Sequence, residues 1–227
     1  MDDAPSPLSV GPEMTATSLE RRGPASAASM LHASNLLTYA SLLAGLSAMI
    51  AASWYHSRSI AGMAMATIVV LDTFDGRFAR QFVRTPAERE FGVQLDSLAD
   101  AVNSGMMPIA VMLGLLPAMS RPVAAVWIAA AFVYLLGVVT RLGFYNLTHA
   151  EGKFFVGLPA PVAALTVATM LLWPLSALPA AILMSVAGLA MISPVRILRP
   201  SGVGLFLFVL WPAVVFIGHM LGRGRLF

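Results

Sequence analysis

Four aspartates lie at helical spacing inside apolar sequence, where a carboxylate is energetically costly and normally marks a functional site. Asp72 and Asp75 are three positions apart, and Asp96 and Asp100 are four positions apart. Each spacing places both carboxylates of a pair on one face of a helix. If the two helices are antiparallel neighbours, the carboxylates meet at one depth, and two divalent cations such as Mg²⁺ or Mn²⁺ would neutralise them. Two-metal carboxylate sites of this kind act in displacement reactions at phosphorus.

The composition indicates that membrane helices position these side chains. Of the 227 residues, 58% are hydrophobic and 11% are charged, whereas about a quarter are charged in a soluble domain. The mean hydropathy is +0.80. Long apolar runs without period-two alternation indicate membrane-spanning helices. The sequence therefore predicts an all-α, polytopic transmembrane helical bundle of about six to eight spans, with seven as the best count: 34–54, 59–80, 91–116, 123–146, 156–173, 177–195 and 203–221.

The two ends of the chain differ in character. Residues 1–28 are rich in Ser, Pro and Ala with little to bury, so we expect a disordered tail. We expect residues 29–227 to form one transmembrane domain. The chain has no cysteine, and it lacks the basic runs or aromatic motifs that would indicate nucleic-acid binding.

The distribution of Lys and Arg predicts the orientation of the bundle. If the N-terminus is cytoplasmic, most of the 14 basic residues lie on the cytoplasmic side of the predicted spans. We therefore expect a multi-pass protein of the inner or cell membrane, with the N-terminus and both Asp pairs on the cytoplasmic side.

Small, polar and basic residues near the Asp pairs suit a phosphate-bearing substrate. Gly76 and Ala79 leave space beside the first pair, and Arg80 is able to pair with phosphate. On the first span, Asn35 and Thr38 share a helix face. Ordinary structural roles explain some of these residues equally well, because glycine is common where membrane helices pack and Asn35 is a good helix N-cap.

In order, these residues resemble the signature of the CDP-alcohol phosphatidyltransferase family: Asp72-x2-Asp75-Gly76-x2-Ala79-Arg80, then Gly92-x3-Asp96-x3-Asp100. The resemblance implies that a CDP-linked lipid, usually CDP-diacylglycerol, gives its phosphatidyl group to an alcohol and releases CMP. It also implies a homodimer surrounded by membrane lipids.

The same resemblance assigns roles to individual residues. Asp72, Asp75 and Asp96 are implied metal ligands for two ions of Mg²⁺ or Mn²⁺. Asp100 is implied to complete the metal site and to act as general base on the acceptor hydroxyl. The residues implied to bind the nucleotide are Asn35, Thr38, Gly76, Ala79 and Arg80. Eleven residues separate Arg80 from Gly92, more than the family usually has. The sequence predicts that this excess, in the polar segment 84–90, lengthens a loop.

Two further stretches narrow the choice of acceptor alcohol. The segment FGVQLDSLAD at 91–100 and the pattern RLGFYN…FVGLPAP at 141–161 are similar to the phosphatidylserine synthase branch of the family, whose acceptor is L-serine. Arg141 and Lys153 are the basic residues that we expect to hold the acceptor or the donor phosphates. RLGFYN departs from the branch's RLARFN, so glycerol 3-phosphate, inositol phosphate or another amino alcohol remains open.

A cation-coupled membrane transporter is the alternative from a different class, because carriers also place Asp residues at membrane depth. Carriers tend to have matching interrupted helices in two halves. The second half of this sequence has no second Asp pair. The sequence therefore favours the phosphatidyltransferase.

Overall fold

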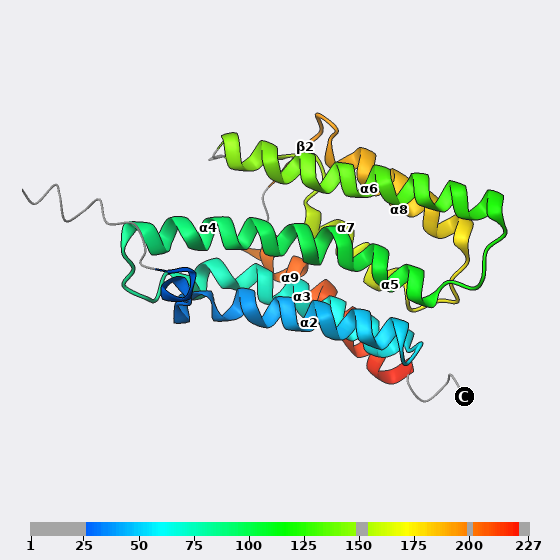
Figure 1. Cartoon of the computed structure of the whole chain (residues 1–227), viewed down its shortest axis with the longest axis horizontal. Helices are drawn as coiled ribbons and strands as arrows, with labels where there is room; N and C mark the ends of the chain where they lie inside the picture. The colour runs from blue at the N-terminus through cyan, green and yellow to red at the C-terminus, as the bar shows by residue number, and fades with distance from the viewer. Residues whose placement is uncertain (1–25, 149–153, 199–201, 223–227) are drawn as a thin grey trace, which may run out of the picture.

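Long apolar helices lie side by side in the computed structural model, which describes residues 26–148, 154–198 and 202–222 (Figure 1). Two short 3-10 segments, η1 (Ala27–Met30) and η2 (Ala33–Asn35), lead into the first helix. The α-helices are α2 (Leu36–Ser53), α3 (Arg58–Ala79), α4 (Pro86–Asp100), α5 (Met107–Leu115), α6 (Arg121–Thr148), α7 (Ala160–Met170), α8 (Ala177–Met191) and α9 (Val203–Gly222). A π-helical segment, η3 (Ala101–Met106), joins α4 to α5. The strands β1 (Phe154–Val156) and β2 (Arg196–Leu198) pair antiparallel.

The all-α membrane architecture predicted from composition is confirmed. In the described part of the chain, five helical stretches are long and apolar enough to cross a membrane: Ala33–Ser53, Arg58–Ala79, Pro86–Leu115, Arg121–Thr148 and Val203–Gly222. The remaining predicted spans, 156–173 and 177–195, form the shorter helices α7 and α8. α7 starts late because Pro161 lies in its first turn, where proline's missing N–H costs no hydrogen bond. Of the predicted tail, residues 1–25 lie outside the described residues.

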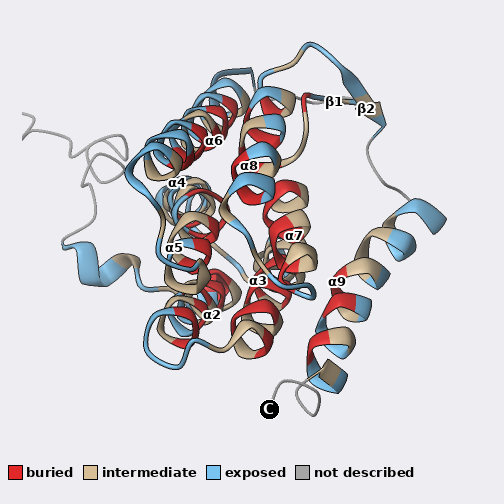
Figure 2. Ribbon diagram, turned by 90° about the vertical axis from the view of Figure 1, so that its right-hand side faces the viewer, coloured by how far each residue is buried: buried red, intermediate tan, exposed pale blue. Residues whose placement is uncertain are grey.

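Small side chains line the helix interfaces, as expected where membrane helices approach closely. Ala48, Ala52 and Ala61 are fully buried on α2 and α3. α6 and α8 approach so closely that a Cβ on Gly137 would meet the backbone of Gly188. Figure 2 shows buried residues facing the centre of the bundle and exposed residues on its outside, with α9 at the edge. The bundle therefore has a packed interior and an apolar exterior suited to lipid.

The start of α4 corrects one prediction. The expectation that residues 84–90 lengthen a loop is wrong, because α4 already begins at Pro86. Thr85 caps the helix by accepting a hydrogen bond from the backbone N–H of Glu88 at 3.3 Å. In return the Glu88 carboxylate accepts one from the backbone N–H of Thr85 at 2.8 Å. This capping box converts most of the additional residues into the first turns of a helix.

The π-helical segment η3 interrupts the third span immediately after Asp100. Two hydrogen bonds hold it. Asn103 Nδ2 donates to Ser41 Oγ on α2 at 3.0 Å, and the Tyr134 hydroxyl on α6 donates to the Ser104 carbonyl at 2.7 Å. Such π-helical turns often occur at functional sites, and this one sets how α4 is rotated relative to α5.

Candidate active site

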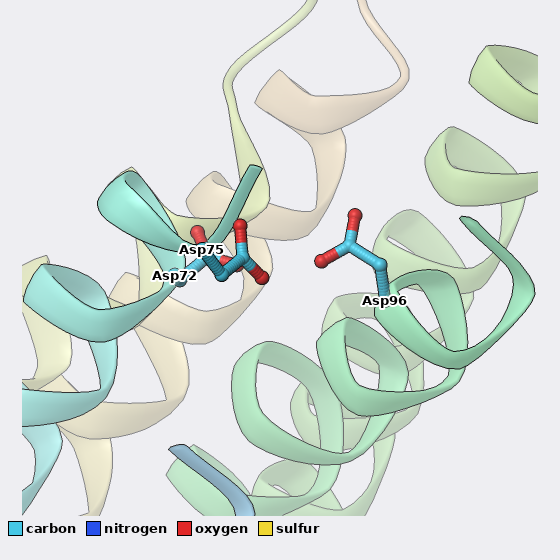
Figure 3. Close-up of side chains that lie close together, drawn as sticks. All are labelled: Asp72, Asp75 and Asp96. Atoms are coloured by element: carbon cyan, nitrogen blue, oxygen red, sulfur yellow. The ribbon is translucent and has the colours of Figure 1, made fainter. Parts of the chain in front are cut away.

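The two Asp pairs meet where the C-terminal half of α3 faces α4. Carboxylate oxygens from Asp72, Asp75 and Asp96 all lie within 4.8 Å of one another. Figure 3 shows the two α3 side chains and Asp96 approaching one another from separate helices. All three side chains are partly buried. A compact set of carboxylate oxygens suits a hard divalent cation such as Mg²⁺ or Mn²⁺, so these residues fit the predicted metal site.

Asp100 joins this cluster from the next turn of α4. Its side chain interacts with that of Asp72, while the side chain of Asp96 interacts with that of Asp75. The structure thus brings together all four aspartates that the sequence singled out. Carboxylates this close repel one another strongly unless positive charge lies between them. The repulsion supports the assignment of the cluster as a cation site.

A polar pocket of about 200 Å³ opens on one side of the cluster, between α2, α3 and α4. Its lining includes every residue predicted to bind a nucleotide: Asn35, Thr38, Gly76, Ala79 and Arg80. It also includes Ser34 and Arg84, which sequence reasoning missed. We call this cavity the polar pocket.

Asn35 occupies the N-cap position of α2, which was its alternative role, but its side chain makes no capping hydrogen bond. The Asn35 Oδ1 atom instead accepts a hydrogen bond from Ser34 Oγ at 3.3 Å. Its Nδ2 atom is buried and has no partner among the described residues. A buried donor without a partner is unfavourable, so this amide is available to a ligand of the polar pocket.

A larger cavity of about 850 Å³ opens on the other side of the cluster. Asp72, Asp96 and Asp100 contribute to its wall. Further lining comes from α3 and α4 and, for the most part, from α6, α7, α9 and the two strands, and it is largely apolar. Asp96 lines both cavities, whereas Asp75 lines only the polar pocket and Asp72 only the larger cavity. The Asp cluster therefore separates two cavities of different chemical character.

Arg141, which the sequence predicted to hold the acceptor or the donor phosphates, lines the larger cavity. The residue is only 7% exposed, and its guanidinium carbon lies 4.4 Å from the centre of the Tyr145 ring. Its Nε atom is buried without a hydrogen-bond partner among the described residues. Lys153, the second predicted acceptor-binding residue, lies outside the described residues.

Residues of the larger cavity that were not predicted include Ser97, Tyr145 and Asn146. Ser97 Oγ donates a hydrogen bond to Asn146 Oδ1 at 3.0 Å and so links α4 to α6. A signal was present, because Ser97 follows Asp96 directly and Tyr145 lies one helical turn after Arg141. The contact between Ser97 and Asn146 joins residues 49 positions apart, and spacing alone does not show such a contact.

Comparison with known proteins agrees with the geometry. Residues 31–194 match the family model described as CDP-alcohol phosphatidyltransferase, and this range contains both Asp pairs and Arg141. The chain belongs to the CDP-alcohol phosphatidyltransferase family. The resemblance seen in the sequence is thus confirmed.

Curated relatives share the same region. The CDP-diacylglycerol–serine O-phosphatidyltransferase of Mycobacterium tuberculosis is 36% identical over 142 residues, which cover 60% of this chain and 47% of that protein. The archaetidylserine synthase of Methanothermobacter thermautotrophicus is 32% identical over 149 residues, or 65% of this chain and 62% of that protein. The CDP-diacylglycerol–serine O-phosphatidyltransferase of Bacillus subtilis is 31% identical over 134 residues, or 57% of this chain and 70% of that protein. The chain spans about half the length of the mycobacterial relative.

Proposed function

We propose that this protein transfers the phosphatidyl group of CDP-diacylglycerol to the hydroxyl of L-serine, forming phosphatidylserine and releasing CMP. The observation that carries the proposal is the position of the Asp cluster between two cavities. One cavity is small and polar, and the other is larger, mostly apolar and contains the buried cation of Arg141. The names of the relatives, two of which refer to serine as acceptor, support the choice of alcohol.

In this proposal the cytidine nucleotide of the donor occupies the polar pocket. Arg80 pairs with its phosphates, and Asn35 offers its unpartnered amide nitrogen to the nucleotide. Gly76 and Ala79 leave the space that the nucleotide fills. The acyl chains of the donor lie toward lipid and the apolar lining of the larger cavity, while the water-soluble acceptor enters beside Asp100.

Asp72, Asp75 and Asp96 would hold the divalent ions, with Asp100 completing the site. When bound, such ions neutralise phosphate oxygens and acidify the acceptor hydroxyl. Thr38 supports the site from α2, because its hydroxyl donates a hydrogen bond to Asp75 Oδ2 at 3.3 Å. A hydrogen bond from outside the ligand set fixes the orientation of a ligating carboxylate.

Asp100 accepts the proton of the serine hydroxyl as the seryl oxygen bonds to the phosphorus that carries diacylglycerol. The bond from this phosphorus to the oxygen bridging toward cytidine breaks, and CMP leaves with that oxygen and the negative charge. Arg141 binds the serine carboxylate and holds the hydroxyl near Asp100. Lys153 remains a candidate for the same role from its place in the sequence.

The proposal includes the membrane orientation and the oligomeric state of the enzyme. The site faces the cytoplasm, in accord with the basic residues near the ends of the spans, and the protein acts as a homodimer with residues 29–227 as its transmembrane domain. A cytoplasmic site is consistent with a water-soluble acceptor.

Release of CMP by the purified protein in mixed micelles tests the function. The reactions contain CDP-diacylglycerol, Mn²⁺ or Mg²⁺, and one acceptor each: L-serine, glycerol 3-phosphate, inositol phosphate or choline. We expect metal-dependent release with L-serine that EDTA abolishes. If CMP is released only with another acceptor, that alcohol would take the place of L-serine in the proposal and the reaction type would stand. If no acceptor gives metal-dependent release, the proposal would be contradicted.

A further inference from the structure

Arg84 is a second arginine of the polar pocket and lies outside the Asp-containing signature. It belongs to the short connection between α3 and α4, two residues before the start of α4. Both Arg80 and Arg84 line the pocket. Arg84 is the more enclosed of the two, since it is partly buried while Arg80 is exposed. Its Nε atom is buried and lacks a hydrogen-bond partner among the described residues.

Gly92 leaves the space that Arg84 occupies. A Cβ at Gly92 would lie 3.3 Å from Arg84 Nη1 and 3.2 Å from Asn35 Oδ1. Both contacts are tighter than ordinary packing, so any side chain at this position would push the two groups away. The Arg84 guanidinium and the Asn35 amide therefore approach the same point on α4 from two different segments.

The capping box fixes the backbone next to Arg84. Glu88 is the nearest acidic residue in the sequence, but its carboxylate accepts hydrogen bonds from Thr85 N at 2.8 Å and Thr85 Oγ1 at 3.0 Å. The charges of Glu88 and Arg84 attract each other, but the buried Arg84 Nε atom has no hydrogen-bond partner among the described residues. This donor is therefore available to a ligand.

The charges around the polar pocket specify the ligand. Asp75 and Asp96 are the acidic residues of its lining, and Arg80 and Arg84 are the basic ones. The two guanidinium groups lie near different helices. Arg80 Nη1 lies 3.9 Å from the position of a Cβ on Gly76 in α3, whereas Arg84 Nη1 lies 3.3 Å from that of a Cβ on Gly92 in α4. Two guanidinium groups that line one small cavity suit a group with several anionic oxygens, and the planar fork of arginine binds phosphate by two hydrogen bonds.

We propose that Arg84 is a phosphate-binding residue of the donor site, which binds the diphosphate of the CDP-linked lipid from the α4 side of the pocket, while Arg80 binds it from the α3 side. This inference rests on the proposed function. Arg84 acts in binding, and its contribution is to offset the repulsion between the diphosphate and the carboxylates of Asp75 and Asp96. The extended start of α4 places it there.

Calorimetric titration of the purified, Mn²⁺-supplemented protein with CDP and with cytidine tests this role. Arg84→Gln keeps much of the side-chain stem and removes the charge, and Arg84→Lys keeps the charge and removes the fork. Arg89→Gln is the matched control, because Arg89 is an exposed arginine in the first turn of α4 that does not line the pocket.

We expect Arg84→Gln to weaken CDP binding by about 10- to 100-fold, the range for loss of a hydrogen bond to a charged group. Cytidine affinity should not change in any variant. Arg84→Lys should lose less CDP affinity than Arg84→Gln, and Arg89→Gln should bind CDP as tightly as the unaltered protein. If Arg84→Gln does not fold, a loss of CDP affinity in Arg84→Lys, relative to the unaltered protein, still tests the contribution of the guanidinium fork.

Two results would overturn the inference alone. The first is unchanged CDP binding in the Arg84 variants, and the second is an equal loss of CDP and cytidine binding, which would indicate a structural role. Failure of the unaltered protein to bind CDP would overturn the proposed function as well.

Discussion

Thr38 and Asp75 connect the first and second long helices at the Asp cluster, where Thr38 Oγ1 donates a hydrogen bond to Asp75 Oδ2 at 3.3 Å. Thr38 is 6% exposed, so water does not compete freely for this bond. The residue also lines the polar pocket. The bond favours a role in orienting Asp75, in addition to the nucleotide contact implied by the family resemblance.

Replacing Thr38 by Val should therefore weaken metal activation. Valine preserves the shape and removes the donor, and loss of a supporting hydrogen bond typically costs about 10- to 100-fold in metal affinity. We expect the Mn²⁺ concentration for half-maximal CMP release to rise by about tenfold, while Thr38→Ser stays near the unaltered protein. A change in the KM for CDP-diacylglycerol alone would contradict the positioning role and favour a direct contact with the nucleotide.

Removing a carboxylate from the cluster should abolish activity in an unaltered fold. For Asp100→Asn we expect CMP release to fall by at least about 100-fold, because a positioned general base contributes about 10²–10⁴. Asp96→Asn should lose as much, because Asp96 lines both cavities. Gln94→Ala, on the exposed side of the same helix, is the control and should retain activity. Substantial activity in both Asp variants would contradict the assignment of the cluster.

Arg141 should control the affinity for the acceptor. Its guanidinium is buried over the Tyr145 ring and lines the cavity that contains Asp100. In Arg141→Gln we expect the KM for L-serine to rise by about tenfold or more, as for loss of one charged hydrogen bond, with an unchanged KM for CDP-diacylglycerol. Steady-state CMP release with each substrate varied in turn measures both. A rise confined to the donor KM would place Arg141 on the donor phosphates instead.

The sequence predicted the meeting of the four aspartates better than it predicted the elements that carry them. Helical periodicity was sufficient for the Asp pairs, because i,i+3 and i,i+4 spacing fixes a common helix face whatever surrounds it. The early start of α4 had a local signal in Thr85-Pro86-x-Glu88, a capping box with proline in the first turn, which the polar composition obscured.

Other features depend on contacts between distant parts of the chain. The π-helical segment after Asp100 is held by Ser41, which is 62 positions from Asn103. The strands β1 and β2 are too short to show period-two alternation. They pair with each other although α7 and α8 lie between them in the sequence. Local propensity does not encode either feature, because tertiary hydrogen bonds stabilise both.

The contact between Gly45 and the π-helical segment leads to a prediction about stability. A Cβ at Gly45 would collide with Asn103 Oδ1, while Asn103 Nδ2 donates to Ser41 Oγ on the same helix as Gly45. Gly45→Ala must displace Asn103 or separate α2 from η3, and overpacking of this kind costs about 1–3 kcal/mol. We expect a lower unfolding temperature and reduced CMP release, because η3 begins directly after Asp100.

Gly143→Ala is the matched control for Gly45→Ala. Gly143 lies in α6, and a Cβ there would meet nothing within 4 Å. Alanine at this position should leave stability unchanged or raise it by up to about 1 kcal/mol through helix propensity. Thermal unfolding of both variants in detergent compares the two sites directly. If Gly45→Ala unfolds at the same temperature as Gly143→Ala and keeps full activity, then Asn103 can move without cost, and the π-helical segment does not determine the position of Asp100.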